Sequence, residues 1–318
     1  MYTIVPRHVR EDMEWMADIG TDAVVIGVLE QDLFAAVENI GIIAAEAQRA
    51  GMQLFVTPSR WGSLIAGCPK VPSLFSSCRP EVWALQNDGT ASTAFGPMAS
   101  VHHPATFDFF VSSLEKLFSI APVGGVIWDE PKALRKHDCS RAAREALKDQ
   151  DIDDINVHTD AQADFFERVN TEALRMNPGL DISMFVFGHL SGYVVERCAS
   201  ISNLHAFGLD GRPFRATDTG ENDSGKPATK LLCDQGPYFV EVAHKANKKA
   251  FILVENLAMS PGHVSIMDKR MPEILGLGAE HICYYYYPRS VSDPDQAMRV
   301  LGKHLAPWKQ SSGRTAVT

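Results

Sequence analysis

Two adjacent carboxylic acids end the apolar run in GGVIWDEPK, where Asp129 and Glu130 stand before Pro131. Adjacent carboxylates repel each other, and carboxylates are rarely buried unless they are paired. Further acids follow two other apolar runs: Asp210 follows LHAFGL, and Glu255 ends ILVE. Two carboxylic acids facing each other across a pocket can cleave a glycosidic bond. One protonates the departing oxygen while the other attacks or activates water.

Eight short apolar runs alternate with helix-period segments and would position these acids. Each run is rich in Val, Ile, Phe or Tyr, as in parallel strands that are buried on both faces. The predicted strands are 22–28, 52–58, 81–86, 124–128, 181–188, 204–209, 250–256 and 281–287. Apolar stripes at helical spacing predict the helices between them. The pattern predicts an α/β fold, a single (β/α)8 TIM barrel over residues 1–308, with a disordered tail at 309–318.

Composition restricts the partners of this chain. A net charge of −9 and a pI near 5.7 argue against nucleic acid, because phosphate binding requires a basic face. No apolar stretch reaches the eighteen residues of a membrane span. The six cysteines lack metal-ligand spacing, which predicts reduced thiols and a cytoplasmic protein; an exported protein could instead pair Cys68 with Cys78. We expect a small carbohydrate partner, no cofactor and no metal, and the sequence leaves a homo-oligomer open.

The residues that follow each predicted strand are the candidate substrate contacts, because the active site of such a barrel lies at the C-terminal ends of its strands. Trp61 offers an aromatic face that suits stacking on a sugar, with plain packing as the alternative. His189 suits a sugar hydroxyl, with a core histidine as the alternative. The predicted substrate-binding residues are Arg60, Trp61, Asn87, His103, Trp128, His189, Arg212 and Tyr286.

The sequence WDEP at the end of the predicted fourth strand resembles the Asn-Glu-Pro signature of the retaining (β/α)8 glycoside hydrolases of clan A. In that clan the strand-four Glu is the acid/base and a Glu ending strand seven is the nucleophile. The resemblance therefore implies these roles for Glu130 and Glu255. The sequence departs from the signature at Asp129, because an ionised Asp only accepts hydrogen bonds where the clan's Asn also donates them.

Two other glycosidase arrangements resemble the same residues. Some barrel glycosidases use a strand-four Asp as nucleophile and a strand-six Asp as acid/base, which would assign catalysis to Asp129 and Asp210. The substrate-assisted hexosaminidases use an Asp-Glu pair, in which Asp129 would orient an acetamido group. Structural roles are the alternative for each acid: a helix N-terminal charge for Glu130, and pairing with a nearby arginine for Glu255 or Asp210.

Two other classes of function use the same rim. A metal-dependent sugar isomerase, epimerase or lyase would need several ligands at strand ends, and Glu30, Glu130, His189 and Glu255 could supply them. A sugar-binding barrel without catalysis would keep rim aromatics and need no titratable pair. We predict a glycoside hydrolase that cleaves a small glycoside or oligosaccharide with retention of configuration.

Overall fold

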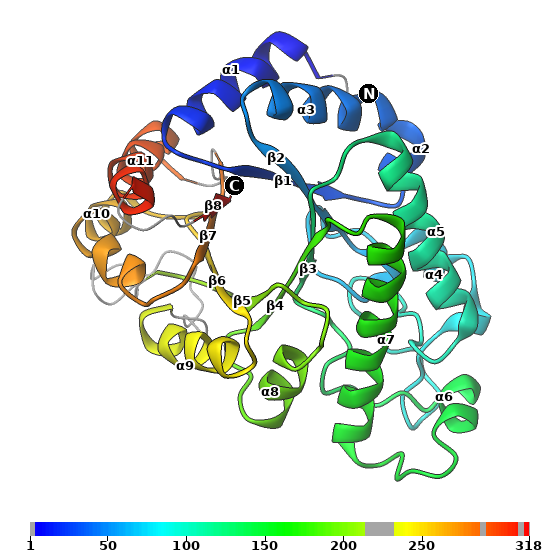
Figure 1. Cartoon of the computed structure of the whole chain (residues 1–318). Helices are drawn as coiled ribbons and strands as arrows, with labels where there is room; N and C mark the ends of the chain where they lie inside the picture. The colour runs from blue at the N-terminus through cyan, green and yellow to red at the C-terminus, as the bar shows by residue number, and fades with distance from the viewer. Residues whose placement is uncertain (1–3, 214–231, 287–290, 311–314, 318) are drawn as a thin grey trace.

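The computed structural model describes residues 4–213, 232–286, 291–310 and 315–317. Its strands run parallel and close into a barrel in chain order, from β1 through β8. They are β1 (Ala23–Val28), β2 (Gln53–Pro58), β3 (Gly125–Asp129), β4 (Asp181–Phe187), β5 (Ala206–Gly211), β6 (Lys249–Val254), β7 (His281–Tyr284) and β8 (Thr315–Val317). Helices surround the strands on the outside (Figure 1). The α/β class and the parallel barrel are as the alternating pattern predicts.

Helix α1 precedes the first strand, and the other helices lie between strands. The helices are α1 (Pro6–Asp18), α2 (Asp32–Ala35), α3 (Val37–Arg49), α4 (Leu74–Ser77), α5 (Pro104–Ile120), α6 (Arg141–Ala146), α7 (Ile155–Met176), α8 (Tyr193–Ala199), α9 (Leu232–Lys245), α10 (Pro261–Leu275) and α11 (Pro294–Gln310). Two 3₁₀ turns, η1 (Trp61–Ser63) and η2 (Pro80–Val82), lie between β2 and α5. Within the described residues, no helix is both long and apolar enough to span a bilayer.

Side chains from alternate strand positions fill the inside of the barrel. Phe55, Ile127, Phe185 and Phe251 belong to one small buried cluster there, separate from the larger core between strands and helices. Gly208 makes room for this packing, since a Cβ at that position would lie 1.5 Å from the carbonyl oxygen of Phe251. Because side chains on a strand alternate in direction, the same alternation decides which strand-end residues face the mouth of the barrel.

The predicted strand at 81–86 is not a barrel strand, and this changes the count of the strands after it. Residues 59–103 instead form an insertion between β2 and α5, with η1, α4, η2 and three isolated antiparallel bridges, such as Trp83 with Ala99. Val82 and Ala84 of this run are buried and Trp83 and Leu85 are partly buried, which explains its strand-like apolar pattern. Asp129 therefore ends the third strand of the barrel, and Glu255 follows the sixth.

The last strand lies in the segment that we expected to be a disordered tail. Helix α11 runs through Gln310, and the backbone of Thr315–Val317 pairs with both β7 and β1. This pairing closes the ring, and residues 311–314 and 318 lie outside the described residues. The short strand escaped the sequence analysis because three residues leave no periodicity to detect.

Candidate active site

A cavity of ≈ 500 Å³ opens at the carboxyl ends of the strands. Its floor is the inner barrel cluster, including Ile127, Phe185 and Leu253. Four acids line it, and three of them lie at the ends of three different strands, β3, β5 and β6. The lining acids are Asp129, Glu130, Asp210 and Glu255. The four acids that the sequence singled out are therefore brought together at one cavity.

Strand alternation separates the roles of the two adjacent acids. Asp129 lies two positions after Ile127, an inner-cluster residue, so it continues the inward-facing series on β3. Asp210 on β5 and Glu255 after β6 continue the same series, four and two positions beyond inner-cluster residues Ala206 and Leu253. Glu130 follows the last residue of β3, and its backbone has a φ of 41°, in the left-handed region, so the strand alternation does not extend to it.

Asp210 and Glu255 form a carboxyl pair on neighbouring strands. The Asp210 residue is buried, 6% exposed, and burial raises the pKa of its carboxyl well above the usual value. The charges of Glu255 and Asp129 and a hydrogen bond with Glu255 raise this pKa further. Two carboxyls in hydrogen-bond contact share a proton, because two adjacent negative charges are costly in a buried site. Asp210 therefore holds a proton at a pH where an exposed aspartate is ionised.

Glu255 is held from its other side by Arg212. The guanidinium Nη1 of Arg212 donates to the carbonyl oxygen of Leu257 at 2.6 Å, and its Nε lies 3.9 Å from Glu255 Oε2. Arg212 was predicted to contact the substrate, but it is not part of the described cavity lining. It instead supports Glu255, which does line the cavity.

Lys132 is a cation that lines the cavity beside its four acids. Its Nζ donates to Glu130 Oε2 at 2.8 Å and lies 4.2 Å from the centroid of the Phe187 ring. Burial lowers the pKa of Lys132, whereas the charges of Asp129 and Asp210 raise it. Glu130 is buried, 6% exposed, and Lys132 compensates its charge by an ion pair at the cavity wall.

Arg60, in the SRWGS loop that follows β2, also lines the cavity. It is only 3% exposed, and its guanidinium carbon lies 4.3 Å from the centroid of the Phe95 ring. Its backbone has a φ of 64°, which non-glycine residues seldom adopt. Burial lowers the pKa of Arg60, and the charges of Cys68 and Asp129 oppose that shift. Of the predicted substrate contacts, Arg60 is in the described lining of the cavity.

Three predicted aromatic contacts lie elsewhere. Trp61 is fully buried, with its indole N–H donating to the carbonyl oxygen of Val28 at 2.9 Å. Trp128 has the outward parity on β3, and its indole N–H donates to Asn170 Oδ1 of α7 at 2.7 Å. Tyr286 donates its hydroxyl to Asp12 Oδ1 of α1 at 2.8 Å. All three belong to or pack against the outer core: Trp128 and Tyr286 through the parity of their positions, and Trp61 through the η1 turn of the insertion.

Two predicted contacts have local structural roles. His103 caps α5, since its Nδ1 accepts the backbone N–H of Ala105 at 3.2 Å. His189 is exposed beside Phe187, with 5.2 Å between ring centroids, and is outside the described cavity lining.

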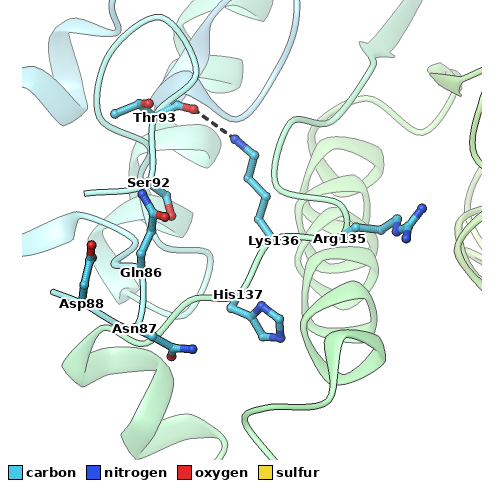
Figure 2. A pocket seen from close by; sticks show the side chains of 8 residues that line it. All are labelled: Gln86, Asn87, Asp88, Ser92, Thr93, Arg135, Lys136 and His137. Atoms are coloured by element: carbon cyan, nitrogen blue, oxygen red, sulfur yellow. Dashed lines mark hydrogen bonds between the residues drawn. The ribbon is translucent and has the colours of Figure 1, made fainter. Parts of the chain in front are cut away.

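Asn87 lies in a second, open cavity of ≈ 610 Å³ between the insertion and the loop after β3. Figure 2 shows its polar lining, in which Lys136 Nζ reaches the carbonyl oxygen of Thr93 at 3.0 Å and Arg135 points away from Asn87. Its lining contains one acid, Asp88. The described lining thus lacks the pair of carboxyls that glycoside cleavage requires.

Glu30 is a structural carboxylate. It is 5% exposed and accepts hydrogen bonds from the backbone N–H groups of Gly62 and Phe75 and from the Ser73 hydroxyl. These bonds attach the insertion to the end of β1. Within the described ranges, no group of His, Cys, Asp or Glu side chains is arranged to hold a metal ion, so the four ligands predicted for a metal enzyme are not assembled.

Sequence reasoning missed several polar residues of the cavity. Ser59, Cys68, Lys70, Lys132 and Tyr285 line it. Lys132 stands beside the WDEP signature, and Tyr285 lies two positions after Cys283 of the inner cluster, so alternation would have identified it. Burial raises the pKa of Tyr285, as do the charges of the three inward acids. Cys68 and Cys78 are exposed and form no disulfide, so the alternative pairing is absent from this structure.

Comparisons with known proteins give a likeness in structure and none in sequence. No family model matches the chain, and the search of curated proteins finds no match. The α-L-fucosidase isoenzyme 2 from Paenibacillus thiaminolyticus is similar with a TM-score of 0.68 at 11% identity, over 95% of this chain and 46% of that one. The β-galactosidase from the psychrophilic Marinomonas ef1 gives 0.64 at 12%, over 97% and 60%.

A third similar structure is GH5_18 from Streptomyces cattleya in complex with GlcNAc. It has a TM-score of 0.62 at 13% identity, over 99% of this chain and 77% of that one. The chain spans about half the length of the first two structures. All three are glycoside hydrolases, and at these identities the likeness establishes a shared glycosidase-like fold.

Proposed function

We propose that this protein is a glycoside hydrolase on a (β/α)8-type barrel, with Asp129 and Asp210 as its catalytic carboxyls. One observation supports this most: Asp210 is a buried, proton-holding acid at the same cavity as Asp129. A general acid must be protonated at working pH, and its partner must be ionised, so the two need different environments. Asp210 has the first environment, and half-buried Asp129 has the second.

The spacing of the strands favours this pair over Asp210 with Glu255. A hydrogen-bonded pair of carboxyls is too close to flank an anomeric carbon, which requires about 5–9.5 Å. Strands β3 and β5 are separated by β4, so their backbones lie about 10 Å apart and inward side chains can span the remaining gap. Glu255 then acts as the group that keeps Asp210 protonated.

This assignment departs from the clan A resemblance. The acids of that clan end strands four and seven, whereas Glu130 and Glu255 follow strands three and six of this barrel. Glu130 is also engaged by Lys132 in an ion pair. The arrangement with two aspartates shows the same offset of one strand, on strands three and five here, but it does not require the Glu130 that Lys132 engages.

The proposed reaction uses the cavity as follows. Asp210 donates its proton to the departing oxygen while Asp129 attacks the anomeric carbon from the other face. Asp210, now ionised, then takes a proton from the water that displaces the sugar, and configuration is retained. The neighbouring Lys132 favours the ionised form of both aspartates by its charge. A volume of ≈ 500 Å³ suits one or two sugar rings.

Aryl glycosides of several sugars test the proposal. Asp210→Asn should reduce turnover of poor leaving groups by about 10²-fold or more and affect activated leaving groups much less, because only the former need a proton. Asp129→Gly should lose turnover with every leaving group and regain it with azide, giving an azide adduct of inverted configuration. Asp88→Asn, in the second cavity, is the control.

The outcomes separate the alternatives. Azide rescue of Glu255→Gly but not of Asp129→Gly would make Glu255 the nucleophile and overturn our pair. An inverted product, seen by proton NMR before mutarotation, would make Asp129 the base that activates water. Absence of hydrolysis across the sugars, by folded protein, would contradict the proposed function.

A further inference from the structure

The cavity that we assign to glycoside cleavage also contains a buried cation whose hydrogen-bonding capacity is unused. Two nitrogens of Arg60, Nε and Nη1, are buried and have no hydrogen-bond partner among the described residues. Arg60 is only 3% exposed, and it lines the cavity. Burying a charged group without partners is costly, so such a group calls for a ligand.

The fold holds Arg60 in this costly place through several independent contacts. Its backbone N–H donates to the carbonyl oxygen of Ala66 at 3.1 Å, and its own carbonyl accepts from Ser63 at 2.8 Å. Glu30 fixes the adjacent Gly62, and Trp61 is hydrogen-bonded to β1. A left-handed backbone conformation that surrounding contacts impose is the kind of strain found at ligand sites.

The charged side chains around the cavity are not balanced near Arg60, where one more anion could be accommodated. Lys132 is paired with Glu130, Glu255 lies beside Arg212, and Asp210 holds a proton. Lys70 is a second cation beside Arg60: its Nζ lies 5.2 Å from the Phe95 centroid, and no ion pair is recorded for it among the described residues. The two positive charges of Arg60 and Lys70 therefore exceed the single negative charge of Asp129, which acts on Arg60.

We propose that the substrate is an acidic sugar whose carboxylate binds Arg60, that is, a uronic acid glycoside. This inference rests on the proposed function and deepens it. The Phe95 ring covers one face of the guanidinium, so a ligand must approach its N–H groups near the guanidinium plane. A planar carboxylate fits such an approach, with Lys70 adding attraction at the exposed edge.

Binding of free sugars to the wild-type protein tests this without any turnover. Isothermal titration with D-glucuronate and D-galacturonate should give dissociation constants at least about tenfold lower than with D-glucose and D-galactose. Arg60→Gln should abolish that difference, and Arg60→Lys, which keeps the charge, should retain part of it. Arg79→Gln is the matched control, since its exposed guanidinium lies 5.2 Å from the Phe75 ring outside the cavity and should leave the ratio unchanged.

Equal affinity for acidic and neutral sugars would overturn the inference, as would a preference that survives in folded Arg60→Gln. If Arg60→Gln does not fold, the wild-type ratio measured at 50 and 500 mM salt replaces it, and a ratio insensitive to salt would also overturn the inference. Sugar 6-sulfates and 6-phosphates form the third arm, and tighter binding of either would overturn the carboxylate assignment.

Turnover separates this inference from the proposed function. Preferential cleavage of aryl uronides over the matching neutral glycosides would support both. Tight uronate binding with no hydrolysis of any glycoside would support the acidic ligand and contradict the hydrolase.

Discussion

At the scale of single residues, the parity of a strand position decides what an acid can do. Asp129 continues the inward series of β3 and faces the mouth of the barrel, whereas its neighbour Glu130 lies beyond the strand and pairs with Lys132. Asp210 differs from both because burial and the neighbouring carboxylates favour its protonated form. Acid chemistry here depends on environment, because the residue types are alike.

The charge of Glu255 should set the alkaline limit of activity. Asp210 acts as an acid only below its pKa, so kcat/KM should fall as the pH rises through that pKa. Glu255→Gln removes a charge that raises the pKa of Asp210, so the alkaline limb should move to lower pH. A pH–rate profile on an aryl glycoside measures the shift, and a limb that stays in place would contradict the pairing.

Asp210 should also give stability a recognisable pH dependence. Its pKa is raised in the folded state, so the folded protein binds the proton more tightly than the unfolded chain does. This contribution is fully present below the unfolded pKa, near 3.9, and is lost as pH rises through the folded pKa. Relative to wild type, Asp210→Asn should therefore gain stability as pH increases in that window, which urea unfolding at several pH values would show.

Asp88→Asn provides the contrast for that measurement. Hydrogen bonds from Thr90 lower the pKa of Asp88, so its contribution to stability has the opposite slope with pH. The same slope in both variants would indicate a general charge effect and contradict a specific role of Asp210.

At the scale of elements, an insertion in place of a simple βα connection builds one wall of the cavity. Residues 59–103 carry Arg60, Cys68, Lys70 and Phe95 to the mouth of the barrel. Their attachment to β1 depends on buried Glu30, which satisfies three donors of the insertion. The insertion therefore supplies the cations of this wall, and the strand ends supply the acids Asp129, Asp210 and Glu255.

Glu30→Ala should weaken this attachment. The substitution leaves buried backbone N–H groups without acceptors, so the free energy of unfolding should fall by roughly 2–4 kcal/mol. The Michaelis constant should rise as Arg60 loses its fixed position. Denaturant unfolding and steady-state kinetics measure both effects, with Glu38→Ala on the exposed face of α3 as the control. A variant as stable as that control would contradict the structural role of Glu30.

At the scale of the whole molecule, closure of the barrel depends on a strand of three residues. The backbone of β8 pairs with β7 through Thr315, Ala316 and Val317, and Val317 also pairs with Ala23 of β1. An open barrel would expose two unpaired strand edges, which favour aggregation. Helices surround the barrel in Figure 1 and pack on it through an extensive core. Pairing of β8 therefore adds to the stability that this core already provides.

Truncation after Gln310 should therefore lower the thermal midpoint and increase light scattering on heating. A chain ending at Val317 keeps β8 and is the matched control. An unchanged midpoint in the shorter chain would show that pairing of β8 contributes little to the stability of the barrel.

The sequence by itself determined the α/β class, the parallel strands and the acids of the site. These follow from local patterns: buried parallel strands are continuous apolar runs, and acids directly after such runs lie at one rim. It also singled out Arg60, which lines the same cavity. Local pattern failed at 81–86, because residues buried in an insertion show the same apolar run as a barrel strand.

Only the tertiary structure decided which acids lie close together. Trp61, Trp128 and Tyr286 have residue types that suit a sugar, yet the tertiary structure packs them into or against the outer core. The contact between Asp210 and Glu255 joins positions 45 residues apart, on neighbouring strands whose distance no local pattern encodes. Proton affinity follows burial and neighbouring charge, and both exist only once the chain has closed around the cavity.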